Sequence, residues 1–280
     1  MDGTIGGEGT GVALRAGRAW NAAALLASLA VLLCVPADVQ AGAADPHRHF
    51  RASTGVSYIS GDYGQSEDTD ILYVPLTVRA DFEPMLFRLT IPYLRIRGPG
   101  NVVGGTDGTV IVDATPTGRE TQEGLGDIVA SATYAYLPTG PAPVVELTGK
   151  VKFPTADEDE GLGTGEFDFT LQLDLFKTWQ RFTPFGTLGY RFLGDGSGFD
   201  LDDVLFASVG TSIRVTSRLS AGLVYDWREA STGGVSDAHE LVPFASFKFG
   251  ERYRLNGYGI AGLSSGAADW GGGLAFGVDF

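Results

Sequence analysis

Charged side chains recur at every second position inside segments that are otherwise apolar. In residues 144–153, for example, Glu146, Lys150 and Lys152 alternate with valine, leucine and phenylalanine. A period of two is typical of a β-strand, so these charges share one face. A ring of charged side chains around a narrow passage can select solutes by charge. The chemistry that this pattern offers is therefore solute selection, provided that the strands close around a lumen.

The sequence offers few candidate residues for catalysis or for metal binding. Ser231, Asp237 and His239 lie close together in the sequence, and a nucleophile, a base and an orienting carboxylate need only spatial proximity. The alternative is that they are polar residues at a strand end, and we predict no catalytic residue. The acidic run at 157–160 is either a solvated surface or a loose divalent-cation site, since hard cations take carboxylate oxygens. We predict no metal site and no cofactor.

About twelve alternating segments supply the strands that must position these residues. Their ranges are 50–60, 71–82, 85–96, 127–137, 144–153, 167–177, 182–193, 204–215, 219–228, 239–249, 253–263 and 270–280. Each has about the 9–11 residues that a tilted transmembrane strand needs. An even number of strands puts both termini on one side of the membrane, which in bacteria is the periplasm. The sequence therefore predicts an all-β fold, a single antiparallel transmembrane β-barrel of about twelve strands.

The links between these segments alternate in length. The short links are 83–84, 139–141, 178–181, 216–218 and 250–252, and the long ones are 61–70, 97–126, 155–166, 194–203, 229–238 and 264–269. Short periplasmic turns and longer outer loops are typical of outer-membrane barrels. A soluble β-sandwich also has many short strands, but it does not need such an even set. The longest link is long enough to fold inward and plug the lumen.

The N-terminal region has the features of a secretory signal peptide. Arg15 and Arg18 precede an apolar run at 22–35, and a small-x-small cleavage site ends at Ala43. Cleavage would remove Cys34, the single cysteine, so we expect no disulfide. The formal net charge of -14 argues against nucleic acid as a partner.

Two domains follow from this reading. We predict a cleaved signal peptide over residues 1–43 and a barrel over residues 44–280, located in the bacterial outer membrane.

In the segment 253–263 the alternation shifts phase, and we predict a bulge near Gly257.

Four glycine-containing stretches form a recognisable set. They read GLGDI at 124–128, GKVKFPT at 149–155, GLGTG at 161–165 with the strand after it, and TPFGTLGYRFLGD at 183–195. Together they resemble the outer-membrane proteins labelled "MetA-pathway of phenol degradation", over roughly residues 50–280. The resemblance implies uptake of aromatic compounds and transfers no ligand residue.

The last segment resembles a second known pattern. The chain as given ends on an alternating strand whose apolar face we expect lipid to cover. That face resembles the C-terminal signal read by the barrel-assembly machinery. It is formed by Leu274, Phe276, Val278 and Phe280.

Alternation also predicts which charged side chains line the lumen. They are Arg79, Asp81, Arg88, Glu146, Lys150, Lys152, Asp168, Asp174, Arg191, Asp226, Arg228 and Lys248. A slip of one residue would place each Arg or Lys in lipid, at about 2–4 kcal/mol near the midplane. If Phe182 faces Lys177 across its turn, Asp168 lies directly opposite Arg191. The charges either brace the wall as cross-strand pairs or form a selectivity ring.

The function that we expect is that of an outer-membrane channel or transporter for passive uptake of small solutes, aromatic or hydrophobic in character. A closed barrel with a structural or surface-interaction role is the alternative, and an outer-membrane lipid hydrolase is the third reading. The expected partners are outer-membrane lipid and lipopolysaccharide, the barrel-assembly machinery and a small-molecule solute, with no nucleic acid.

Overall fold

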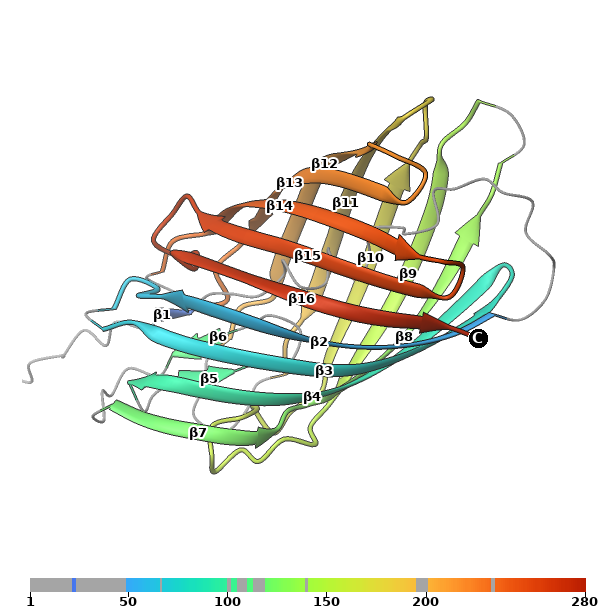
Figure 1. The fold of residues 1–280 in the computed structure, drawn as a ribbon. Coiled ribbons are helices and arrows are strands. Elements are labelled where there is room, and N and C mark those ends of the chain that lie inside the picture. The colour runs from blue at the N-terminus through green and yellow to red at the C-terminus, as the bar shows by residue number, and fades with distance from the viewer. Residues whose placement is uncertain are drawn as a thin grey trace, which may run out of the picture.

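One curved wall of antiparallel strands dominates the structure (Figure 1). The computed structural model describes residues 22–23, 49–65, 67–99, 102–104, 110–112, 119–138, 141–194, 201–232 and 235–280. The wall strands are β2 (His49–Gly61), β3 (Thr69–Phe82), β4 (Met85–Pro99), β7 (Arg119–Leu125), β8 (Ile128–Tyr136), β9 (Val144–Phe153), β10 (Asp168–Phe176), β11 (Phe182–Phe192), β12 (Val204–Arg214), β13 (Leu219–Arg228), β14 (Ala238–Phe249), β15 (Tyr253–Gly262) and β16 (Trp270–Asp279).

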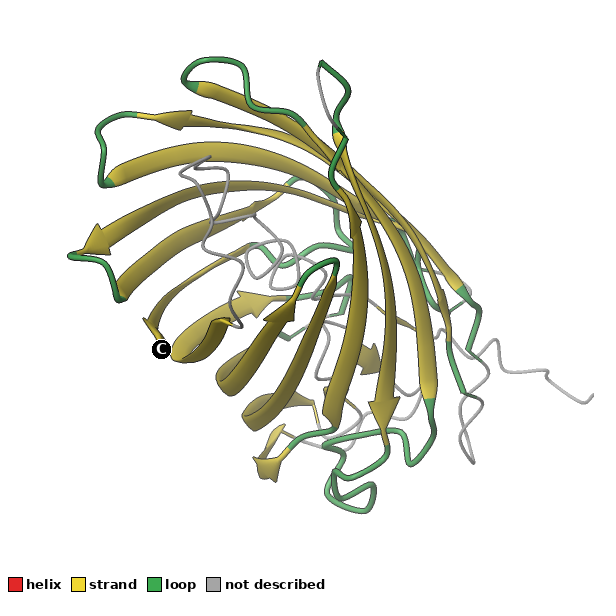
Figure 2. Ribbon diagram, turned by 90° about the vertical axis from the view of Figure 1, so that its right-hand side faces the viewer, coloured by secondary structure: helices red, strands yellow, loops and turns green. Residues whose placement is uncertain are grey.

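The wall closes on itself. Each strand pairs with its neighbours, β16 pairs with β2, and the β3–β4 pairing completes the ring (Figure 2). β7 and β8 both pair with β4, one along each half, so they act as a single interrupted strand and the barrel has twelve strands. Among the described residues no helix is long and apolar enough to cross a membrane. The predicted all-β barrel is thus confirmed.

The two faces of the wall differ as a period of two predicts. On the outer face Leu76, Val209 and Leu274 expose 52%, 61% and 56% of their surface. On the inner face Thr77, which follows Leu76, and Ser208, which precedes Val209, are buried. An apolar band facing outward and polar residues facing inward are the arrangement that lipid requires of a spanning barrel. The protein accordingly lies in the bacterial outer membrane.

The barrel has a turn end and a loop end. At the turn end the strands are joined by short links, and the Phe280 backbone N–H donates to the Phe50 carbonyl at 2.8 Å. The rings of Phe50, Phe82 and Phe87 also meet here, with centroids 5.9 and 6.2 Å apart. Aromatic girdles of this kind mark the membrane interface. At the loop end lie the longer links, including residues 154–167.

The link predicted at 97–126 is shorter than expected. β4 continues to Pro99 and the wall resumes at Arg119 in β7, because the alternation extends beyond the apolar residues that marked the strand. Inside the link, β5 (Val102–Gly104) and β6 (Val110–Val112) form a small separate sheet with β1 (Ala22–Ala23). Apart from Ala22 and Ala23, the predicted signal peptide lies outside the described residues. The signal peptide and the inward-folding plug both stay predictions.

A bulge interrupts the wall at a different place from the predicted one. Tyr93 pairs with Leu125 and Thr90 pairs with Val129, so two residues of β4 oppose three on the β7–β8 strand. The extra residue falls in Gly126-Asp127, a typical β-bulge. Around Gly257 the pairing with β16 runs without a break, and the predicted bulge there is wrong. The strand keeps its phase, and its apolar residues change face because Tyr258 and Ile260 point to an inner face that is itself apolar at this level.

The two ends give a prediction about orientation. If the loop end faces outward, a Glu-specific protease added to intact cells should cut at Glu158 and Glu160, which are exposed, and spare Glu251 in the β14–β15 turn. Mass spectrometry of the fragments distinguishes the sites. Cleavage confined to Glu251 would show that the orientation is inverted.

Candidate functional site: the barrel interior

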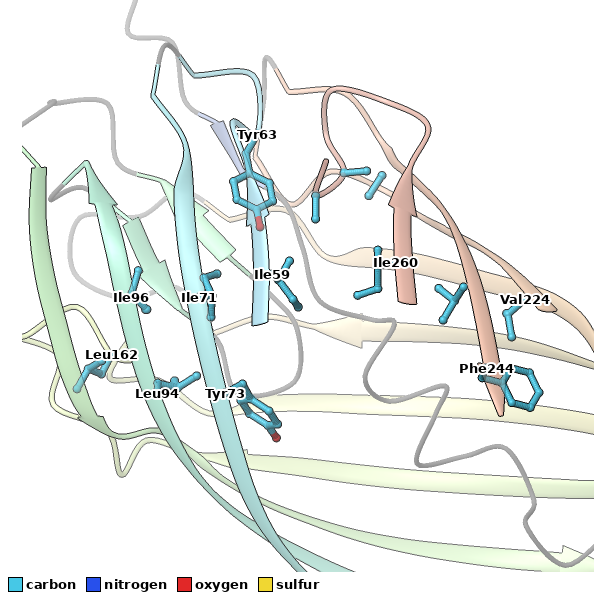
Figure 3. Packing of buried hydrophobic residues seen from close by; sticks show 14 residues of the cluster. Ile59, Tyr63, Ile71, Tyr73, Leu94, Ile96, Leu162, Val224, Phe244 and Ile260 are labelled. Carbon is cyan, nitrogen blue, oxygen red and sulfur yellow. The ribbon is translucent and has the colours of Figure 1, made fainter. Parts of the chain in front are cut away.

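An apolar cluster occupies the loop end of the interior (Figure 3). Its members are buried and come from both the wall and the loops. They are Ile59, Tyr63, Ile71, Tyr73, Leu94, Ile96, Leu162, Val224, Ala238, Val242, Phe244, Ile260, Ala267 and Ala268. Ile59, Ile71 and Ile96 are direct cross-strand partners on β2, β3 and β4. We call this set the interior apolar cluster.

Aromatic side chains occur both within the cluster and beside it, where Phe185 and Tyr258 pack against it. Phe185 and Phe244 lie 6.5 Å apart between centroids, and the Tyr258 hydroxyl donates to Ser57 Oγ at 2.7 Å. Tyr63 lies in the β2–β3 loop with no exposed surface. Burial raises the pKa of its phenol, and the nearby Glu240 carboxylate adds to the rise. Tyr63 is therefore neutral, and it is among the largest side chains that the cluster buries completely.

A buried lysine forms a second feature, which we call the Lys152 clasp. Lys152 Nζ lies 2.7 Å from Asp168 Oδ2 and 3.5 Å from Asp127 Oδ2, and it donates to Thr164 Oγ1 at 3.0 Å. The lysine and both carboxylate side chains are at most 4% exposed. A buried lysine between two carboxylates and a hydroxyl is satisfied by charge and by hydrogen bonds. Losing it would leave two buried carboxylates without their cation.

The clasp also fixes the loop at 154–167. Asp127 Oδ1 accepts the backbone N–H groups of Thr155 at 3.0 Å and Ala156 at 2.9 Å. Thr155 Oγ1 in turn accepts the Ile128 N–H at 2.9 Å. A Cβ at Gly163 would lie 2.9 Å from Asp127 Oδ2, so only glycine lets the loop pass this close. The loop is thereby held against the wall, and it delivers Leu162 to the interior apolar cluster.

The clasp explains why the glycine-containing motifs occur together. Asp127 comes from GLGDI, Lys152 and Thr155 from GKVKFPT, and Gly163 and Thr164 from GLGTG. Asp168 begins the strand that follows, and its Oδ1 accepts the Gly194 N–H at 3.1 Å, which brings in the end of the fourth motif. The motifs thus build one structural unit at the loop end of the barrel.

The predicted opposition of Asp168 and Arg191 is wrong by two residues. Thr170 is the direct partner of Arg191, and Asp168 is the direct partner of Lys152. The β10–β11 turn is tighter than expected, because Trp179 and Phe182 already exchange backbone hydrogen bonds of 2.7 and 3.0 Å. A shift of two residues preserves the face, so Asp168 and Arg191 still lie on the same side of the sheet.

Ion pairs connect the charged residues at the turn end. Arg79 Nε lies 2.6 Å from Asp81 Oδ1. Asp279 accepts Arg51 Nε at 2.5 Å and Arg254 Nε at 3.0 Å. Arg254 was not predicted, because the supposed bulge at Gly257 hid its phase; unbroken alternation from Tyr253 would have found it. Two further predicted residues, Arg88 and Lys248, are half-buried here as direct partners of Arg79 and Arg254.

Polar contacts continue up the inner face of β9, β10 and β11. Lys150 Nζ donates to Gln172 Oε1 at 2.6 Å, and Gln172 Nε2 donates to Asp174 Oδ1 at 2.9 Å. Thr187 Oγ1 also donates to Asp174, at 2.6 Å. Glu146 is the direct cross-strand partner of Asp174. These contacts agree with wall bracing, and whether the residues also line a passage stays a prediction.

Near the loop end the predicted charges are deeply buried. Arg191, Asp226 and Arg228 are at most 3% exposed, and Glu240 is the direct partner of Asp226. The guanidinium carbon of Arg191 lies 6.0 Å from the centre of the Phe206 ring. The predicted charged residues therefore lie on the inner face of the barrel. Those towards the turn end are half-buried, and those towards the loop end are fully buried.

The interior apolar cluster was missed at the level of the sequence. A signal for it existed, since Ile71 has the same phase as Arg79, and Leu94 and Ile96 have the same phase as Arg88. Alternation alone therefore places these apolar residues on the face of the charged ones. The expectation that an inner face must be polar hid them.

The conceivable catalytic trio is not assembled. His239 Nδ1 lies 2.7 Å from the Tyr225 hydroxyl. Asp237 accepts Trp227 Nε1 and the Ala230 N–H, each at 3.2 Å. Among the described residues, neither His239 nor Asp237 hydrogen-bonds the other or Ser231. The lipid-hydrolase reading therefore loses the geometry that it requires.

A closed antiparallel barrel with an apolar outer face and a loop clasped at one end defines an outer-membrane β-barrel protein. The sequence family described as "Putative MetA-pathway of phenol degradation" matches residues 73–280, and the chain belongs to this family. The resemblance noted in the sequence is thus confirmed. No curated protein matches the sequence.

Solved outer-membrane barrels share the fold. The COG4313 outer membrane channel from Pseudomonas putida F1 has 15% identity and a TM-score of 0.65, over 87% of this chain and 100% of that one. The transport unit of the autotransporter AIDA-I from Escherichia coli has 12% identity and a TM-score of 0.48, over 91% and 96%. The CymD monoaromatic hydrocarbon channel has 8% identity and a TM-score of 0.43, over 84% and 88%. At these identities the likeness concerns the fold alone.

Proposed function

We propose that the protein is an outer-membrane channel for the passive entry of small aromatic or hydrophobic solutes. The observation that carries the proposal is the interior apolar cluster. The interior of an outer-membrane barrel is usually polar, whereas here Phe244, Tyr73 and Ile71 lie on the inner face. Apolar surface gains about 25 cal/mol per Å² when it leaves water, so this interior favours solutes that carry apolar surface over water and inorganic ions.

Two further findings support the proposal. The family description refers to phenol degradation, and the solved barrel with a TM-score of 0.65 is described as an outer membrane channel. In this proposal the half-buried members of the predicted lumen set line the route between the turn end and the cluster; they are Arg79, Asp81, Arg88, Glu146, Lys150, Asp174 and Lys248. Leu274, Phe276, Val278 and Phe280 remain the proposed assembly signal, and the first two expose 56% and 42% of their surface to the lipid side.

A closed barrel is the second candidate. Leu94, Val224 and Val242 have no exposed surface. Side chains that are inaccessible on the inner face imply that the interior is filled at their level. The two candidates differ in whether the cluster parts to let a solute through.

Phenol should act on the channel current. In planar bilayers we expect the purified barrel to give a steady potassium chloride current that phenol lowers, because phenol occupies the interior apolar cluster. Ethylene glycol, a small polar solute without an aromatic ring, should leave the current unchanged. Phe244→Ser removes a ring from the cluster and should raise the half-blocking phenol concentration about fivefold, which corresponds to about 1 kcal/mol.

The outcomes separate the candidates. A silent wild-type barrel that is correctly folded would establish the closed barrel. A conducting barrel that phenol and ethylene glycol affect equally would be a channel without the proposed preference for aromatic solutes. Phe249→Ser is the matched control, since Phe249 is an exposed ring at the turn end of the same strand.

A further inference from the structure

The strand register assembles five basic residues into one row on the inner face. Arg51 is the direct partner of Arg79, and Arg79 is the direct partner of Arg88. The row continues from Arg88 through Ser131 to Lys150, and from Lys150 through Thr170 to Arg191. We call Arg51, Arg79, Arg88, Lys150 and Arg191 the basic row.

The basic row climbs the wall instead of forming a ring. Arg51 lies near the turn end of β2, Lys150 lies beyond the middle of β9, and Arg191 is the second-last residue of β11, close to the loop end. Strands in a barrel are tilted, so a line of direct partners ascends as it passes around the wall. The row therefore joins the turn end to the level at which the interior apolar cluster begins.

Wall bracing does not account for this arrangement. Like charges directly opposite each other across strands are destabilising, and the row contains two such pairs, Arg51 with Arg79 and Arg79 with Arg88. Acidic residues accompany the row, since Asp279 contacts Arg51 and Asp81 contacts Arg79. Along the line of direct partners from Arg51 to Arg191, however, the residues between the cations are Ser131 and Thr170. Bracing would be achieved more simply by alternating the signs along the row.

The side chains of the row reach the interior. Those of Arg51 and Arg79 are 18% and 17% exposed. Arg88 and Lys150 are likewise half-buried. Arg191, at the upper end of the row, is buried against the Phe206 ring. A solute inside the barrel would thus meet cations along the wall and then an aromatic and aliphatic surface.

We propose that the basic row binds and guides the anionic group of the solute, so that the preferred substrates are small aromatic monoanions such as aromatic carboxylates. Carboxylates form strong charge-assisted hydrogen bonds with guanidinium and ammonium groups. Successive sites of moderate affinity allow a solute to enter and to leave. This inference rests on the proposed channel function, and it adds a charge requirement to the apolar one.

The test measures which aromatic ion carries current. Reversal potentials are recorded in planar bilayers under gradients of sodium benzoate and of benzyltrimethylammonium chloride at pH 8. Neutral benzoic acid that crosses the lipid carries no current, so only the ions count. We expect wild-type barrel to favour benzoate over sodium, and the Arg79→Gln, Arg88→Gln, Lys150→Gln triple variant to lower that permeability ratio about fivefold, corresponding to about 1 kcal/mol.

Two control variants test whether the effect comes from the charges of the basic row. Arg79→Lys, Arg88→Lys, Lys150→Arg keeps every charge and should keep the benzoate preference. Arg218→Gln removes an exposed cation from the β12–β13 turn and should also leave it unchanged. Heat-modifiable mobility on gels shows whether each variant has folded.

Each outcome decides a different statement. Loss of the benzoate preference in the neutral triple variant, with retention in the charge-preserving one, supports the basic row. Equal passage of both aromatic ions by wild-type barrel, or an unchanged ratio in the neutral variant, overturns the basic row and leaves the channel in place. A wild-type barrel that conducts potassium chloride but passes neither aromatic ion also overturns the basic row and leaves the channel in place. A folded wild-type barrel that conducts no ion at all overturns the channel function, and the inference falls with it.

Discussion

Replacing Lys152 by methionine should destabilise the barrel strongly. The substitution removes the cation shared by Asp127 and Asp168 and leaves both carboxylates buried, with side chains at most 4% exposed. Breaking a buried ion pair on one side costs about 3–5 kcal/mol. We expect this loss in the free energy of unfolding, measured by urea titration of the barrel in lipid vesicles. The loop at 154–167 should also become sensitive to protease.

Lys150→Met is the matched control for this experiment. Lys150 lies on the same strand and the same face, but it is half-buried and donates to the neutral Gln172. Its loss should cost no more than about 1 kcal/mol, the upper range for a partly exposed polar contact. The two lysines should also differ in transport, since only Lys150 belongs to the basic row. Equal destabilisation by the two substitutions would refute the clasp.

A neutral clasp provides a second check on the same idea. The Asp127→Asn, Lys152→Met, Asp168→Asn variant has no buried charge at this site and should recover part of the stability that Lys152→Met loses. Asparagine retains an oxygen that accepts the N–H groups of Thr155 and Ala156. If the triple variant is less stable than Lys152→Met, the cost does not come from uncompensated charge.

Alternation predicted the wall well because lipid penalises every error of phase. A strand displaced by one residue would place residues such as Arg79 or Lys150 in hydrocarbon, so a spanning sequence must keep its period of two. The number of strands and their approximate bounds follow from this one constraint. The same constraint assigned Asp168, Asp174 and Arg191 to a common face before any pairing was known.

Pairing between strands was less predictable, because turns decide it. The β10–β11 turn closes two residues tighter than assumed, with Gln180 in the left-handed region at φ 56°. Nothing in the local sequence demands that conformation of a glutamine. The bulge at Gly126-Asp127 is stabilised by contacts with residues 155 and 156, about thirty positions away in the chain, which local alternation does not contain.

The inner face was harder still, since lipid does not constrain it. Inside the barrel apolar, charged and small residues are all tolerated, and the choice among them depends on function and on packing with loops. Ile59, Ile71 and Ile96 meet because three strands bring the same residue type to one level. The clasp forms because glycine at 163 admits a loop that Asp127 then holds. Both features depend on contacts between segments that are distant in the sequence.

Arginine at position 274 should destabilise the barrel far more than arginine at position 275. Leu274 lies midway along β16, exposes 56% of its surface and faces lipid, so Leu274→Arg places a charge near the midplane at about 2–4 kcal/mol. Ala275 follows it on the inner face, opposite Gly55 and Asn256. Those neighbours are small or polar and the inner face does not meet lipid, so Ala275→Arg should cost less than about 1 kcal/mol.

The two substitutions test opposite faces of one strand. They introduce the same side chain at adjacent positions of one strand and at almost the same depth. Urea unfolding in vesicles of defined lipid gives the free-energy difference, and the yield of heat-modifiable barrel in cells gives an independent reading. In thinner bilayers the cost of Leu274→Arg should fall, because the charge then lies closer to the interface, whereas that of Ala275→Arg should stay constant. Equal costs at both positions would mean that the assignment of the two faces along β16 is incorrect.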